Sequence, residues 1–122
     1  MKYVDGFLLA VPKKNLGAYR RLAQKSEKIW REYGALDYKE CAGDDLKVKM
    51  GVPFTRPMKV TSGETVVFSY IVYKSRAHRD AVNKKIMNDP RVKDLCDPKK
   101  MPFDMKRLCY GGFRVIIDGG AS

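Results

Sequence analysis

Four segments of the chain carry the β-branched and aromatic residues that are typical of strands. YVDGFLLAV, residues 3–11, ends at Pro12, and ALDYKECA, residues 35–42, predicts a second strand. TVVFSYIVY, residues 65–73, is the strongest strand segment in the chain. LCYGGFRVIID, residues 108–118, predicts the last strand, which is followed by a loose GGAS tail.

A periodic pattern of apolar residues after the first strand predicts a long amphipathic helix over residues 16–33. Asn15 is expected to cap its start, and Gly34 is expected to end it. At about 100° per residue, apolar and basic side chains fall in opposite arcs. The apolar arc holds Leu16, Tyr19, Leu22, Ala23, Ile29, Trp30 and Tyr33, and the basic arc holds Lys14, Arg20, Arg21, Lys25, Lys28 and Arg31.

A second helix is predicted over residues 76–89, with Ser75 as its cap and Pro90 as its interruption. A further helical turn is expected over residues 91–96. Residues 43–63 are rich in glycine and proline and predict a long loop, with a short extended piece near Phe54.

The order of these elements is β-α-β, a loop, and β-α-β, within 122 residues. This order predicts one α+β domain over residues 1–122 with a ferredoxin-like βαββαβ fold. Two helices would then lie on one face of a four-stranded antiparallel sheet.

Both faces of the predicted sheet are apolar. In residues 65–73 one face holds Val66, Phe68, Tyr70 and Val72, and the other holds Val67, Ser69, Ile71 and Tyr73. The last strand places Leu108, Tyr110 and Ile116 on one face and Phe113, Val115 and Ile117 on the other. Because two helices cover only one face, we expect a homodimer whose sheets face each other and bury roughly 1,200–2,000 Å².

The composition limits the expected cellular location of the protein and the classes of partner that it could bind. No apolar run is long enough to cross a bilayer, and no signal-peptide pattern follows Met1. Cys41, Cys96 and Cys109 are scattered, which favours reduced cysteines and a cytoplasmic location. The net charge of +11 raises the alternative of a basic nucleic-acid-associated protein, although no recognition motif accompanies the charge.

Three segments, YVDGFLLAVPKKN, ETVVFSYIVYKSRAHRDAVNKKIMNDPR and MPFDMKRLCYGGFRVII, resemble the YbaA-like family of uncharacterised bacterial proteins. The resemblance spans nearly the whole chain and implies the dimeric α+β barrel superfamily. It implies no particular activity. Related superfamily members include cofactor-free monooxygenases, muconolactone isomerase-like enzymes, haem-using peroxidases and stress-linked proteins, and their ligands typically lie between the sheet and the helices.

Candidate ligand-binding residues come from the second helix and the strands. His78 and Lys85 fall in the predicted inward arc with Ala77, Ala81, Val82 and Ile86, and together they would polarise an anionic or enolisable ligand. The structural alternative is a hydrogen-bonded histidine and a lysine whose stem lies along apolar surface. Tyr70 and Tyr110 are further candidates for a pocket lining.

The segment 99–117 supplies the last candidates. Asp104 and Arg107 are interpreted either as polar groups at a pocket mouth or as an ion pair that orders the loop. In the structural interpretation, Pro102 fixes a turn, and Gly111 and Gly112 permit a bulge or the close approach of a bulky neighbour to the strand.

The sequence predicts no metal site and no bound cofactor, because His78 is the only histidine and no nucleotide-binding motif occurs. The favoured function is binding of a small apolar or aromatic molecule between sheet and helices, with cofactor-independent monooxygenase or isomerase chemistry. The alternative is a non-enzymatic binding or stress-related protein.

Overall fold

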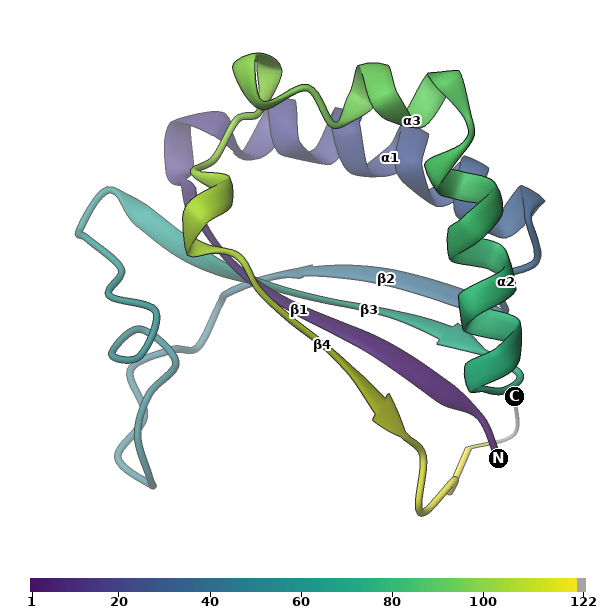
Figure 1. The fold of residues 1–122 in the computed structure, drawn as a ribbon. Helices are drawn as coiled ribbons and strands as arrows, with labels where there is room; N and C mark the ends of the chain where they lie inside the picture. Colours follow the sequence, from purple (N-terminus) through teal and green to yellow (C-terminus); the bar gives the residue numbers. More distant parts are fainter. Residues whose placement is uncertain (121–122) are drawn as a thin grey trace.

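Four antiparallel strands form one sheet in the computed structural model, which describes residues 1–120 (Figure 1). They are β1 (Tyr3–Pro12), β2 (Asp37–Ala42), β3 (Glu64–Tyr73) and β4 (Cys109–Arg114), in the spatial order β2-β3-β1-β4. With the helices between them, the strands have the order and pairing of an α+β ferredoxin-like fold. The predicted fold class is confirmed.

All helices in the described residues lie on one side of the sheet (Figure 1). They are α1 (Leu16–Glu32), α2 (Arg76–Met87) and the short α3 (Pro90–Leu95). Three 3₁₀ turns, η1 (Lys13–Asn15), η2 (Pro98–Lys100) and η3 (Met105–Arg107), join them to the strands. The predicted cap of α2 is confirmed, because the Ser75 side chain accepts a hydrogen bond from the backbone N–H of His78.

The main core lies between the helices and the sheet, because alternate strand residues point to the helix side. From the strands this core contains Tyr3, Leu9, Val11, Val67, Ile71 and Tyr73, all buried. From the helices it contains Tyr19, Ala23, Ile29, Val82, Ile86 and Val92.

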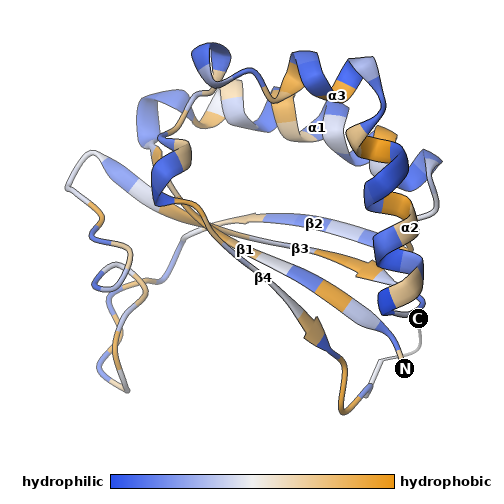
Figure 2. Ribbon diagram, in the orientation of Figure 1, coloured by the Kyte–Doolittle hydropathy of each residue, from blue (hydrophilic) through white to orange (hydrophobic). Residues whose placement is uncertain are grey.

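The opposite face of the sheet is apolar as well, and residues 43–63 cover only one end of it. Met58 of this loop is 5% exposed and packs against Ala10 and Val66. Beyond the loop, Phe68 and Phe113 are 46% and 61% exposed. Figure 2 shows hydrophobic segments in the loop and after β4, both on the side of the sheet away from the helices. We call this surface, formed by Leu8, Phe68, Phe113 and their neighbours, the open face.

The last strand is shorter than the predicted residues 108–118. Arg114 at its end already pairs with Tyr3, the first residue of β1. Beyond that point one backbone bond remains, from Val115 N–H to the carbonyl of Lys2, so the ladder has no further partner strand. Residues 121–122 of the predicted tail lie outside the described residues.

Asn15 stands at the N-cap position of α1, as predicted, but its side chain makes no capping hydrogen bond there. The η1 turn runs directly into the helix, and the Asn15 amide Nδ2 instead donates a 2.9 Å hydrogen bond to the carbonyl of Pro102. This bond ties the start of α1 to the segment that follows α3. The contact matters for the site because that segment covers part of the core.

Candidate functional site

A cleft lies between α1 and the helix side of the sheet. Its outer part, about 490 Å³, runs along the edge strand β2, with Arg20 and Gln24 at its rim. Its inner part, about 170 Å³, lies deeper between the sheet and the helices. Tyr19, Ala23, Tyr38 and Glu40 line both parts, so they form the boundary between them.

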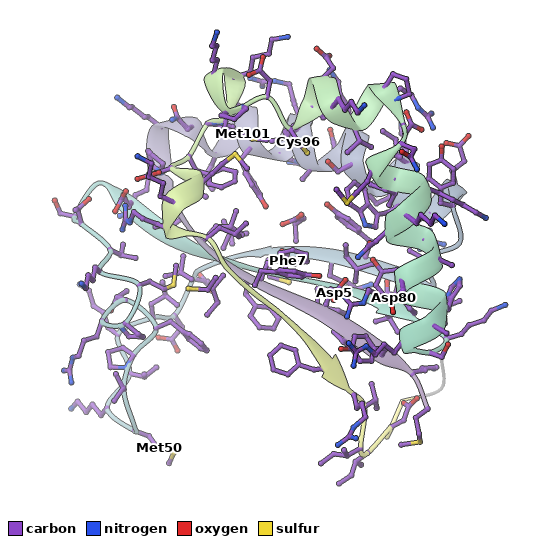
Figure 3. The ribbon with its side chains drawn as sticks, in the orientation of Figure 1. Asp5, Phe7, Met50, Asp80, Cys96 and Met101 are labelled. Atoms are coloured by element: carbon purple, nitrogen blue, oxygen red, sulfur yellow. The ribbon has the colours of Figure 1, made fainter. Side chains whose placement is uncertain are left out.

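The inner part of the cleft is mostly apolar and aromatic. Phe7 and Ile71 form its floor on the sheet, and Trp30 contributes a wall from α1. The segment between α3 and β4 closes it from above through Met101, Phe103 and Leu108 among others. Figure 3 shows Phe7 on the sheet, with Cys96 and Met101 on the opposite, helix side of the cleft.

One carboxylate interrupts this apolar lining. Alternation along β2 turns Tyr38 and Glu40 to the helix side, opposite Ile71 and Ser69 of β3. The Tyr19 hydroxyl donates a 2.7 Å hydrogen bond to Glu40 Oε1, and the Tyr38 hydroxyl donates a 2.9 Å bond to Oε2. Each carboxylate oxygen therefore has a phenol donor, and Tyr19 reaches it from α1 across the cleft.

The environment of Glu40 raises its pKa above that of a glutamate in water. Burial raises the pKa of Glu40, and the hydroxyls of Tyr19, Tyr38 and Ser69 oppose that rise only in part. Among the ion pairs of residues 1–120, none involves Glu40. Burial and the adjacent Glu40 also raise the pKa values of Tyr19 and Tyr38, so both phenols remain protonated donors.

A second polar cluster lies beside α2, outside the cleft. Asp5 is 2% exposed, and its Oδ1 lies 3.6 Å from Arg79 Nη1. The same guanidinium donates hydrogen bonds to the hydroxyls of Tyr110 and Tyr3 at 3.1 and 3.3 Å. Burial raises the pKa of Asp5, and Arg79 opposes it. Figure 3 shows Asp5 on β1 close to Asp80 of α2, which is a further partner of Arg79.

His78 and Lys85 do not line the cleft. The Nδ1 of His78 accepts a 3.0 Å hydrogen bond from the Lys74 N–H, and its ring packs edge-on against Tyr73. Burial lowers the pKa of His78, and the charges of Lys74 and Lys85 add to that effect. Lys85 is exposed on the outer side of α2, as are Ala77 and Ala81, so the predicted inward arc is wrong at these three positions.

The inward position on α2 that the sequence analysis missed is Arg79, whose side chain is only 15% exposed. Asp5, its charged partner, comes from the first strand, far away in the sequence. A helical pattern of apolar residues gives no signal for such a pair, since the arginine stem is buried while its charged end finds a carboxylate.

The predicted pocket tyrosines lie on opposite faces of the sheet. Tyr70 alternates with Ile71 and lies on the open face, away from the cleft. Tyr110 lies opposite Phe7 on the helix side, stacked on the Phe7 ring with 4.9 Å between centroids. It is therefore next to a residue of the cleft floor, and Arg79 holds its hydroxyl.

Asp104 and Arg107 do not pair with each other in the structure. Asp104 is exposed and caps η3 by accepting a hydrogen bond from the backbone of Lys106. Arg107 forms a 2.7 Å ion pair with Glu64 and donates to the carbonyls of Met58 and Lys59. Arg107 thus ties loop 43–63 to the segment that covers the cleft, and neither Asp104 nor Arg107, although both belong to this segment, lines the cleft itself.

The residues that do form the polar centre of the cleft were not singled out by the sequence analysis. Tyr19 was placed in the apolar arc of its helix, and Tyr38 and Glu40 were read only as part of a strand. The sequence does contain one indication of this site. Glu40 is a charged residue on the same strand face as Tyr38 and Ala42, where a buried apolar residue is expected.

Two further observations concern partners. Residues 1–120 contain no group of three or more histidine, cysteine, aspartate and glutamate side chains arranged to hold a metal ion. Within the same residues, no helix combines the length and the hydropathy needed to cross a membrane. The nucleic-acid alternative remains a prediction that rests on the basic charge alone.

Comparisons with solved structures support the fold at low sequence identity. An uncharacterised NIPSNAP domain protein from Burkholderia xenovorans superposes with a TM-score of 0.61 and 15% identity, covering 93% of each chain. Rv0793 from Mycobacterium tuberculosis gives 0.57 with 13% identity, covering 98% of this chain and 100% of that one. A dimeric ferredoxin-like protein from an uncultured marine organism gives 0.52 with 12% identity, covering 97% and 99%.

Comparisons of sequence find relatives with higher identity to this chain. The uncharacterised protein YbaA from Escherichia coli K12 is 47% identical over 118 residues, covering 97% of this chain and 99% of that protein. YbaA from Shigella flexneri is similar to the same extent. The model of the family described as "Protein of unknown function (DUF1428)" matches residues 2–105. The chain therefore belongs to the DUF1428 family, together with the YbaA proteins.

Proposed function

We propose that this protein binds a small, mostly apolar molecule in the cleft between α1 and the sheet, with Glu40 as its polar contact. The observation that supports this most directly is the position of Glu40. Its carboxylate lies between the two parts of an otherwise largely apolar cleft and accepts hydrogen bonds from Tyr19 and Tyr38. Ligand pockets characteristically combine apolar walls with a few oriented polar groups.

The shape of the cleft limits the size of the ligand. The inner part of about 170 Å³ accommodates one or two fused rings, and the outer part of about 490 Å³ provides a route from solvent along β2. Phe7, Trp30 and Phe103 offer ring faces to an aromatic ligand. Of the cofactor-independent reactions considered, an isomerase-like proton transfer fits a carboxyl group in this position better than an oxygenation does.

The binding experiment uses Trp30, the only tryptophan of the chain, as its reporter. The probe is 2-tetralone, a bicyclic aromatic ketone of suitable size. Saturable quenching of Trp30 fluorescence is the expected result, since Trp30 lines the inner part of the cleft. An absence of saturable quenching up to the solubility limit of the probe would contradict the proposed function.

A matched pair of variants tests where the probe binds. Ala23→Leu adds a side chain inside the cleft, whereas Ala18→Leu adds the same side chain to the exposed side of α1. We expect Ala23→Leu to weaken binding by at least about tenfold, because the added atoms occupy the ligand's space. Ala18→Leu should bind as the wild type does. Equal affinities for both variants would place the probe elsewhere.

We also propose that two copies associate through the open face. Phe68 and Phe113 are large and substantially exposed there, next to a shallow hollow lined by Leu8 and Cys109. The solved ferredoxin-like neighbour with 12% identity is described as dimeric, which supports dimer formation by a chain of this fold. The three free cysteines are consistent with a reducing, cytoplasmic location, which we propose as well.

A further inference from the structure

We infer that Glu40 is a general base that takes a proton from the carbon next to the carbonyl of an enolisable aromatic ketone bound in the cleft. This goes beyond binding, because it names a reacting group, a reaction and a substrate class. It rests on the proposed binding function, and the experiment below separates failure of binding from failure of the chemistry.

The geometry places Glu40 where a bound molecule must meet it. Glu40 lines both the inner and the outer part of the cleft, so a ligand that fills either part contacts the carboxylate region. The two phenol bonds hold the carboxylate from two directions, Tyr19 from α1 and Tyr38 from the same strand. A base that is held in a fixed orientation beside the bound molecule is what proton abstraction from carbon requires.

The electrostatic surroundings suit a base better than a structural ion pair. No arginine or lysine forms an ion pair with Glu40 among residues 1–120, in contrast to Asp89 and Glu64. Hydrogen bonds from Arg91 and Arg107 lower the pKa values of these two carboxylates and stabilise their charged forms. Glu40 has only neutral hydroxyl donors, so it accepts a proton at less cost than a carboxylate paired with arginine does.

The proposed step is balanced without any further reagent. The Glu40 carboxylate binds the α-proton, the C–H electron pair becomes the carbon–carbon double bond of the enolate, and the carbonyl π electrons move to oxygen. As Glu40 is protonated it becomes a weaker acceptor, which frees the Tyr19 and Tyr38 hydroxyls to donate to the enolate oxygen. Return of the proton to carbon regenerates the carboxylate and gives the ketone or its isomer.

The test measures hydrogen–deuterium exchange at the α-carbons of 2-tetralone in D₂O by ¹H NMR, with the buffer rate subtracted. We expect the wild-type protein to accelerate exchange, and Glu40→Gln to lose about 10²–10⁴-fold of the protein-dependent rate. Trp30 quenching should persist in Glu40→Gln, because glutamine retains the shape of the side chain. Asp5→Asn is the control, since it removes a buried carboxylate outside the cleft and should keep the wild-type rate.

Each outcome has a definite meaning. Quenching without exchange above the buffer rate overturns the general base and leaves the binding function intact. Exchange that survives in Glu40→Gln, or that Asp5→Asn abolishes equally, also overturns it. No quenching in the wild type removes the binding function and the chemistry together. If circular dichroism shows that Glu40→Gln is unfolded, Glu40→Asp replaces it, and a reduced but measurable rate is expected from the shortened carboxylate.

Discussion

The Tyr19 hydroxyl, on α1, donates a 2.7 Å hydrogen bond to Glu40 Oε1, on β2. This bond crosses the cleft, and the two residues that form it line both its inner and its outer part. It joins the helix layer to an edge strand of the sheet at a place where apolar packing is incomplete. The pair therefore contributes to stability and to the polar character of the cleft at once.

Tyr19→Phe should destabilise the protein by about 1–3 kcal/mol, because a partly buried carboxylate oxygen loses its donor. Urea unfolding measures this change. Tyr70→Phe is the control, since Tyr70 lies on the opposite face of the sheet and its hydroxyl is not part of this network. If both variants lose the same free energy of unfolding, the bond to Glu40 is not the source of the effect.

The stability difference between the wild type and Glu40→Gln should depend on pH. Burial raises the pKa of Glu40 in the folded state above the unfolded value of 4.5. Below the unfolded pKa the carboxyl group is protonated in both states, and its ionisation costs nothing. As pH rises through the folded pKa the wild type loses stability that glutamine does not lose.

Urea unfolding at roughly pH 4 and pH 8 checks this sign, since only the carboxylate titrates between the two variants. The free energy of unfolding of Glu40→Gln, relative to that of the wild type, should be greater at the higher pH. If instead the wild type becomes more stable relative to the variant as pH rises, the folded state stabilises the charged form of Glu40. That result would contradict the raised pKa of Glu40.

Gly112 allows Tyr3 to lie across β4. A Cβ atom at this position would meet the Tyr3 hydroxyl at 2.5 Å and its ring carbons at 2.8 and 3.0 Å. Gly112→Ala should therefore destabilise the fold by about 1–3 kcal/mol, because Tyr3 is buried and has little room to move. Gly63→Ala, where nothing lies within 4 Å of the added atom, is the control for thermal unfolding. Equal melting temperatures for the two variants would contradict the close contact.

Phe68→Asp tests the association of two copies. An aspartate in the centre of the open face would be buried without a partner in a dimer, so we expect a folded monomer. Size-exclusion chromatography with light scattering gives the mass, and circular dichroism confirms the fold. Met87→Asp, at an exposed methionine on α2, should remain dimeric. A wild type that is monomeric in dilute solution would refute the dimer.

Much of the fold was predictable from local pattern. The strands of residues 3–11 and 65–73 have dense apolar runs, and alternation correctly assigned Phe113 and Tyr110 to opposite faces. The end of β4 was not predictable, because it depends on where β1 begins rather than on the residues of β4. Asn15 likewise bonds to Pro102, a residue far along the chain.

The candidate site was less predictable than the fold. Polar residues drew the sequence analysis to His78 and Lys85, but the orientation of α2 is set by tertiary packing, which turns Arg79 toward Asp5 and leaves Lys85 in solvent. Glu40 becomes notable only when α1 places Tyr19 against it. Sites of this kind are formed by contacts between secondary-structure elements. A single sequence predicts the elements but not how they pack against one another.

Intermolecular nuclear Overhauser effects between 2-tetralone and methyl groups of the protein test the location of the ligand most directly. The account predicts cross-peaks from the probe to the methyl groups of Ala23 and Ile71, which line the inner part of the cleft. Cross-peaks to Leu8 on the open face instead, or none at all in the presence of saturating probe, would contradict the binding site around Glu40.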